Sequence, residues 1–202
     1  MSSETSTAPR RADRVTIVVI LVVGALAGAL IAATGLISAI SRVASPDAQT
    51  VRLLADIPVE AGAGIVAAHG DSLVVVADRL DAGILWLIAA GEACGALMVA
   101  AVTLSFGYLL WQVAQRRPFP RAAQTAVLVS GCAIAFGSLL SQGLGGLGQM
   151  MAAGDLQEAT GGMALVQFEL APLPILIGFA IMALAYAFHA GHRLQRDTEG
   201  LV

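Results

Sequence analysis

The sequence predicts an all-α membrane protein with four transmembrane helices and both chain termini in the cytoplasm. A bilayer is indicated by composition, because 57% of the 202 residues are apolar and only 12% are charged, about half the charge of a soluble domain. The number of spans follows from four apolar stretches that are long enough to cross a hydrocarbon core of about 30 Å. These stretches are residues 15–40, 82–113, 122–151 and 170–190.

The N-terminal segment, residues 1–14, is rich in small and polar side chains, and we expect it to be a disordered cytoplasmic end. The first apolar stretch follows it directly. The apolar region of a cleaved signal peptide runs for about 7–15 residues. Residues 15–40 exceed that length, so they predict a retained span.

The loop between the first two spans, residues 41–81, is the longest polar segment and is expected outside the cytoplasm. Two short β-type runs, residues 51–54 and 73–77, flank a turn signal around Gly70. A lone two-stranded pair is marginal in water unless it packs on something. A short β-hairpin and an irregular acidic loop therefore both fit this segment.

The second and third spans, residues 82–113 and 122–151, exceed about 20 residues, so we expect them to tilt or to project beyond the bilayer. The glycine-rich run at residues 143–148 weakens a helix and predicts that this end of the third span is flexible or tightly packed. Small residues four apart let helices approach closely, within one chain or between two copies. Such pairs are Gly24 with Gly28 and Gly91 with Gly95.

The arginines are sorted by side of the membrane. Eight of the eleven lie in the N-terminal segment, in the loop 114–121 or in the tail 191–202, and the chain has no lysine. Basic residues stay in the cytoplasm, so both termini and the loop 114–121 are predicted inside. The segments on the other side carry nine acids: Asp47, Asp56, Glu60, Asp71, Asp78, Asp81, Asp155, Glu158 and Glu169.

The sequence shows no pattern of an enzyme. It lacks the GxxxxGK[ST] phosphate loop, the HExxH zinc pattern and the GxSxG nucleophile elbow. The two cysteines, Cys94 and Cys132, fall inside predicted spans and fit small apolar fillers. His189 and His192 share one face of the fourth helix, but no cysteine or acid cluster completes a metal site there. We therefore expect no enzymatic activity, no metal and no cofactor.

One acid, Glu92, lies inside a predicted span. Exposing it to lipid costs on the order of 2–3 kcal/mol, so we expect it to face the bundle interior. Counting 1.5 Å per residue puts Glu92 about 9 Å from Trp86, the expected outer interface of the second span, and Gln142 about 12 Å from Met150 at the outer end of the third span. The sequence therefore predicts an intramembrane polar pair in which Gln142 donates a hydrogen bond to Glu92. A structural link and a proton- or ligand-linked role both fit this pair.

The cytoplasmic loop concentrates charge in a short segment, which we call the basic loop. It contains Arg116, Arg117 and Arg121, with Phe119 between them. Arginines contact lipid phosphates and phenylalanine can enter the interface, so the loop fits a simple topological anchor. The same residues also fit a docking surface for a cytoplasmic partner.

Two motifs resemble a known family. The run Arg116-Arg117-Pro118-Phe119 and the tail from Phe188 to Val202 resemble the corresponding segments of the bacterial membrane proteins grouped as domain of unknown function 2975. The resemblance covers nearly the whole chain. It implies a four-helix membrane protein without an established activity or site residues, whose gene often lies beside that of a small helix-turn-helix regulator.

The sequence thus predicts a non-enzymatic protein of a bacterial plasma membrane. Its expected partners are the lipid bilayer, a second copy through the small-residue faces and, by the resemblance, a cytoplasmic helix-turn-helix regulator. No direct contact with nucleic acid is expected. The alternative is a small transporter or channel component with Glu92 in its polar path.

Overall fold

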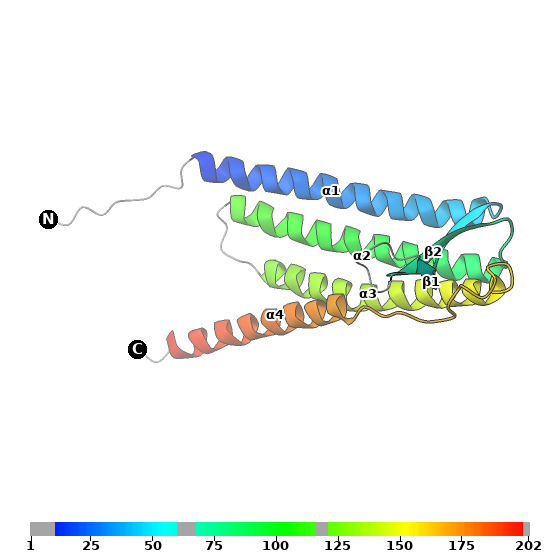
Figure 1. The fold of residues 1–202 in the computed structure, drawn as a ribbon. Coiled ribbons are helices and arrows are strands. Elements are labelled where there is room, and N and C mark those ends of the chain that lie inside the picture. The colour runs from blue at the N-terminus through cyan, green and yellow to red at the C-terminus, as the bar shows by residue number, and fades with distance from the viewer. Residues whose placement is uncertain (1–10, 60–67, 116–120, 200–202) are drawn as a thin grey trace. The chain divides into compact units, whose positions relative to one another are not determined.

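The computed structural model describes residues 11–59, 68–115 and 121–199. Most of the basic loop, residues 116–120, lies outside these ranges. The described residues form four helices and one small sheet (Figure 1). In chain order these elements are α1 (Arg11–Ala44), β1 (Gln49–Val59), β2 (Ala68–Ala77), α2 (Ala82–Ala114), α3 (Arg121–Asp155) and α4 (Pro172–Glu199).

Helix α1 is longer at both ends than the apolar stretch 15–40 that predicted it. It begins at Arg11, so the last residues of the segment expected to be disordered are helical. It ends at Ala44, shortly before Pro46, and a helix normally stops before the residue that precedes a proline. Hydropathy predicts only the apolar part of a helix. The polar turns beyond that part remain helical until a residue such as proline ends the helix. Arg42 therefore lies in the last turn of α1 and not in a loop.

Three helices are long and apolar enough to cross a membrane. The qualifying parts are Val15–Ala44 of α1, Ala82–Gln112 of α2 and Ala123–Asp155 of α3. The apolar part of α4, Pro172–Ala187, is shorter. By length and composition, the described part of the chain thus contains three candidate spans and a fourth, shorter apolar helix.

Strands β1 and β2 form an antiparallel pair, which decides between the hairpin and the irregular loop. Val51 lies opposite Val75, and Leu53 lies opposite Leu73. Val51 and Leu53 are buried, whereas Arg52 between them is exposed. This alternation is typical of a sheet with one packed face and one polar face.

The chain divides into two compact units, which we describe separately. The hairpin unit comprises Ala33–Leu97 and Gly137–Pro172, and the helical unit comprises Met1–Ala32, Met98–Phe136 and Leu173–Val202. Helices α1, α2 and α3 contribute to both units. The β-hairpin lies entirely in the first unit.

The hairpin unit has a core of large side chains. Val51 and Leu53 of β1 pack with Ile84 and Ile88 of α2, and Leu53 and Ile84 are the largest fully buried side chains. The packing partner that a two-stranded sheet needs is thus supplied by the first turns of α2. The cluster is completed by Ala152, Ala153 and Ala164.

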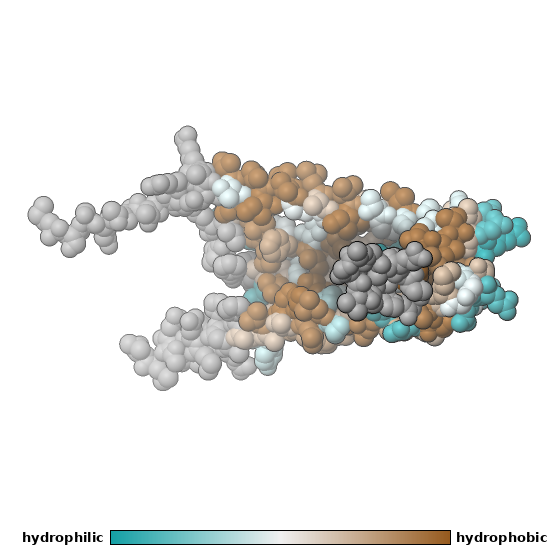
Figure 2. Space-filling model, viewed as in Figure 1, coloured by the Kyte–Doolittle hydropathy of each residue, from teal (hydrophilic) through white to brown (hydrophobic). Residues whose placement is uncertain are grey.

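The helical unit buries small residues and exposes large ones. A Cβ atom on Gly178 of α4 would lie 2.4 Å from the backbone nitrogen of Ala135 on α3, so these two helices touch at their backbones. Val15, Leu26 and Leu104 are all more than half exposed. Figure 2 shows apolar side chains covering α1. Small residues at helix contacts and large apolar residues on the surface are typical of helices that pack in lipid.

Candidate functional site

Glu92 forms an ion pair in the hairpin unit. Its Oε1 atom accepts a hydrogen bond from Nε of Arg42 at 2.7 Å, and the two side chains are only 26% and 19% exposed. Nη1 of Arg42 also donates to the backbone carbonyl of Thr50, at 3.1 Å. One guanidinium therefore links the end of α1 to α2 and to β1.

The predicted hydrogen bond between Gln142 and Glu92 is replaced by two separate contacts. Oε1 of Gln142 accepts the N–H of Ala171 at 2.7 Å, immediately before α4 begins at Pro172. Glu92 has Arg42 as its partner instead. A charge-assisted hydrogen bond is about twice as strong as a neutral one, so an arginine within reach displaces an amide. This partner could not be predicted from hydropathy, because Arg42 lies beyond the apolar stretch 15–40 and was expected in the loop after the first span.

The two carboxylate oxygens of Glu92 differ in hydrogen bonding. Oε2 is buried and has no hydrogen-bond partner among the described residues. A half-paired carboxylate in a partly buried position is costly unless its cation stays in place. Loss of Arg42 would therefore leave the Glu92 carboxylate without a partner and lower the stability of the hairpin unit.

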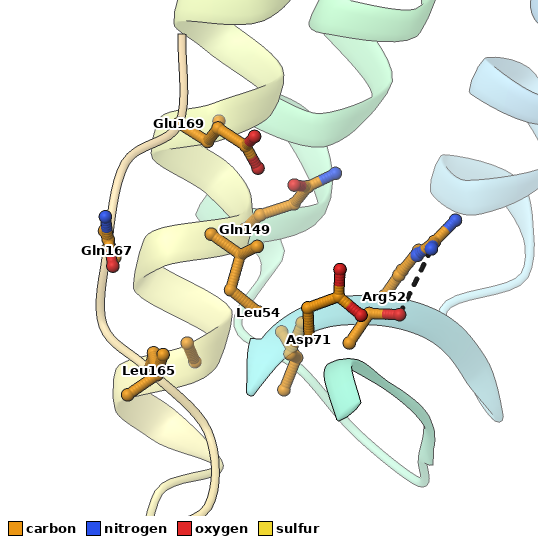
Figure 3. A pocket seen from close by; sticks show the side chains of 11 residues that line it. Arg52, Leu54, Asp71, Gln149, Leu165, Gln167 and Glu169 are labelled. Atoms are coloured by element: carbon orange, nitrogen blue, oxygen red, sulfur yellow. Dashed lines mark hydrogen bonds between the residues drawn. The ribbon is translucent and has the colours of Figure 1, made fainter. Parts of the chain in front are cut away.

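The hairpin unit also contains a polar cavity, which we call the hairpin cleft (Figure 3). Its volume is about 310 Å³. Both strands, the second half of α3 and the segment before α4 contribute to its walls. It is lined by Arg52, Leu53, Leu54, Asp71, Ser72, Gly146, Gln149, Ala153, Leu165, Gln167 and Glu169.

The segment after α3 forms one wall of the hairpin cleft because it pairs with β1. The N–H of Leu165 donates to the carbonyl of Leu54 at 2.8 Å, and Ala55 forms an isolated β-bridge with Ala164. This contact falls where the β1–β2 register shifts, between Leu54 and Ile57. A bulge redirects the strand locally, and here it coincides with the point where a third segment joins β1.

Glycines of the run 143–148 allow the other wall to pack closely. A Cβ atom on Gly146 would lie 2.6 Å from Cε2 of Phe168, and one on Gly148 would lie 2.6 Å from Cγ1 of Ile88. This end of α3 was expected to be either flexible or tightly packed, and Gly146 and Gly148 show tight packing. Gly146 brings the segment that carries Glu169 against α3.

The charges in the hairpin cleft are not neutralised in place. Nη2 of Arg52 donates to Oγ of Ser72 at 3.1 Å, which holds the guanidinium beside the hairpin. Within the described ranges, neither Arg52, Asp71 nor Glu169 has an ion-pair partner. Figure 3 shows the carboxylates of Asp71 and Glu169 and the amide of Gln149 directed into the same space. This site could not be predicted from sequence spacing, since its residues come together only when β2, α3 and the segment before α4 fold.

The helical unit contains a larger but apolar groove, of about 630 Å³, between α1 and α2. Its polar side chains are satisfied locally: Oγ1 of Thr103 donates to the carbonyl of Val99, and the hydroxyl of Tyr108 accepts from Nε2 of Gln112. No described group in its lining is charged. This groove is consistent with contact with lipid chains and offers no polar recognition.

The glycines of the two predicted small-residue pairs differ in whether another helix lies against them. Nothing lies within 4 Å of a Cβ placed on Gly24, whereas one on Gly28 would collide with Thr103 of α2. A Cβ on Gly91 would lie 2.5 Å from the backbone nitrogen of Gly145. Gly28, Gly91 and Gly95 thus serve contacts within the chain, the last with Ser141 of α3, and of these four glycines only Gly24 has open space beside it.

No metal-binding group of three or more histidine, cysteine or acidic side chains is present in the part of the chain that the structure describes. Arg116, Arg117 and Phe119 lie outside the described residues, and Arg121 opens α3. No family model, curated protein or solved structure matches the chain. The resemblance to the domain of unknown function 2975 proteins therefore stays a prediction.

Proposed function

We propose that this chain is a bacterial plasma-membrane protein that crosses the bilayer four times with both termini in the cytoplasm. The observation that carries the proposal is the segregation of arginine: eight of eleven belong to the three segments assigned to one side. Three long apolar helices support the membrane location. Helix α4 is proposed as the fourth span because the apolar stretch 170–190 that predicted it has the length of about 20 residues that a span needs.

The proposed outer boundary of the bilayer lies near Glu92. One face of the first turns of α2 is not available to lipid, because Ile84 and Ile88 are buried in the core of the hairpin unit, whereas Trp86 on the same turns is exposed. The stretch from Glu92 to Trp111 has about 20 residues and spans about 30 Å. Trp111 at its other end suits the headgroup level. The Arg42–Glu92 pair then stands at the boundary, where charge costs less than at the bilayer centre, and the hairpin lies outside.

Reporter fusions test the fourth span. Alkaline phosphatase, which is active only outside the cytoplasm, is expected to be active when fused after Glu169 and inactive when fused after Val202. The reason is that α4 alone separates the two fusion points. Equal activity at both points would mean that α4 does not cross the membrane.

We further propose that the protein is not an enzyme and communicates with a cytoplasmic partner through the basic loop. Three arginines within six residues, with a phenylalanine among them, provide charge and an apolar anchor on one short segment. The resemblance suggests a helix-turn-helix regulator as that partner. The transporter alternative has less support, because Arg42 already binds the carboxylate that would line its polar path.

Neutralising the basic loop tests the partner. Replacement of Arg116, Arg117 and Arg121 by glutamine is expected to lower co-purification of the regulator encoded beside the gene by about tenfold, since several charged contacts are lost together. The matched control replaces Arg193 and Arg196 of the tail. Recovery equal to wild type for the loop variant would reduce the loop to a topological anchor.

A further inference from the structure

The hairpin cleft has the dimensions of a small-molecule site. Pockets that bind small ligands have volumes of about 300–1,000 Å³, and this cleft, at about 310 Å³, is at the lower limit. A ligand of amino-acid size fits such a volume. A folded protein segment or a sugar chain does not.

The charges that line the cleft define what such a ligand must carry. Asp71 and Glu169 enter from two different segments, β2 and the stretch before α4, and are directed toward one space together with Gln149 (Figure 3). Two carboxylates and an amide oxygen are acceptors for a primary ammonium group, which has three N–H donors. A ligand with only negative charge would be repelled by both carboxylates.

Arg52 adds a requirement for a negative group. Its guanidinium uses one N–H to bind Ser72, and it forms no ion pair with an acid among the described residues. A planar guanidinium binds carboxylate or phosphate oxygens through paired hydrogen bonds. A ligand that satisfies the whole cleft therefore carries an ammonium group and an oxyanion on one small molecule.

Part of the lining of the cleft is apolar. Leu54 and Leu165 belong to it, and the backbones of these two residues are joined by a hydrogen bond of 2.8 Å. They provide an apolar surface for a short aliphatic part of a ligand.

We propose that the hairpin cleft binds a small zwitterion, with its ammonium group on Asp71 and Glu169 and its oxyanion on Arg52. Two sources share this chemistry: a free amino acid, and the ethanolamine phosphate headgroup of a phospholipid. The headgroup is included because Glu169 lies just before the first turn of α4. The compartment rests on the proposed function, since the four-span topology puts the cleft outside the cytoplasm. Binding itself does not depend on that topology.

Calorimetric titration of the full chain in maltoside micelles tests the proposal. L-Alanine and phosphoethanolamine are the zwitterionic probes. Ethylamine carries only the ammonium group and acetate only the carboxylate, and we call these two the half-probes. We expect at least one zwitterion to bind, and each half-probe to bind at least about tenfold more weakly, because each loses one set of charge-assisted contacts. Absence of binding by both zwitterions, or equal binding by the half-probes, would overturn the proposal.

Variants assign the contacts. The double substitution Asp71→Asn and Glu169→Gln is expected to weaken zwitterion binding at least about tenfold, and Arg52→Gln is expected to weaken it by a similar factor. Glu158→Gln and Arg79→Gln, which change exposed charges outside the lining, are expected to leave it unchanged. Wild-type affinity in both cleft variants would refute the assignment, and the half-probe comparison on the wild-type chain stands even if a variant fails to fold.

The source of the zwitterion is decided in nanodiscs. In phosphatidylcholine discs the headgroup has no N–H, so alanine affinity should match that in micelles. Adding phosphatidylethanolamine lowers apparent alanine affinity if the headgroup occupies the cleft, and leaves it unchanged if the ligand is a free amino acid. Either result supports the shared chemistry. A failed topology would appear in the reporter fusions instead, without affecting these titrations.

Discussion

Replacing Gly178 with alanine is expected to destabilise the purified protein by about 1–2 kcal/mol. A Cβ at this position would lie 2.4 Å from the backbone nitrogen and 2.7 Å from Cα of Ala135. These are backbone atoms, so they cannot move aside as a flexible side chain would, and overpacking of this kind costs about 1–3 kcal/mol or more. The cost exceeds the gain of about 1 kcal/mol in helix propensity that alanine brings over glycine. Unfolding in mixed micelles of maltoside and dodecyl sulfate measures the difference.

The same experiment has matched controls in the chain. Gly91→Ala should behave like Gly178→Ala, because its Cβ would lie 2.5 Å from the backbone nitrogen of Gly145. Gly24→Ala and Gly107→Ala should be neutral or stabilising by up to about 1 kcal/mol, since nothing lies within 4 Å of either position. If all four variants lost stability equally, glycine content and not helix contact would explain the result.

Breaking the Arg42–Glu92 pair from either side is expected to destabilise the protein by about 2 kcal/mol. Removing one member of a fully buried pair costs about 3–5 kcal/mol, because the other charge is left without a partner. Here both side chains remain partly exposed, at 19% and 26%, so solvent reduces the cost. Arg42→Ala should have the larger effect, since it also removes the donor to the carbonyl of Thr50.

A double-mutant cycle isolates the contribution of the contact. Combining Arg42→Met with Glu92→Leu should cost less than the sum of the two single changes, because no unpaired charge is left behind. Glu158→Ala, on an exposed acid of the same unit, is the control and should change stability by less than about 0.5 kcal/mol. Additive single effects would show that the ion pair contributes nothing by itself.

Hydropathy predicted the helices, because an apolar stretch of about 20 residues has few alternatives to a helix. The β-type runs around residues 51–54 and 73–77 predicted the strands, although packing against Ile84 and Ile88 was needed to make the pair stable. The helix ends were less predictable. Arg42 lies beyond the apolar stretch, so its position on α1 follows from the stop before Pro46 and not from hydropathy.

The side-chain partners at the candidate sites could be predicted only in part from the sequence. The expectation that Glu92 would find a polar partner was sound, but the choice of Gln142 rested on depth alone, and depth does not show which helix faces which. Asp71 and Glu169 come from distant parts of the chain, and both line the hairpin cleft because residues 164–165 pair with β1. No spacing of residues in the sequence predicts the pairing of residues 164–165 with β1.

The most direct test of the proposed topology is thiol labelling in intact cells. Replacing Cys94 and Cys132 by alanine removes the native thiols, after which a single cysteine replaces either Thr7 or Glu158, the latter an exposed residue between α3 and α4. With a membrane-impermeant maleimide, Glu158→Cys is predicted to be labelled in intact cells and Thr7→Cys only after lysis. Labelling of Thr7→Cys in intact cells, or protection of Glu158→Cys until lysis, would contradict a four-span protein with both termini in the cytoplasm.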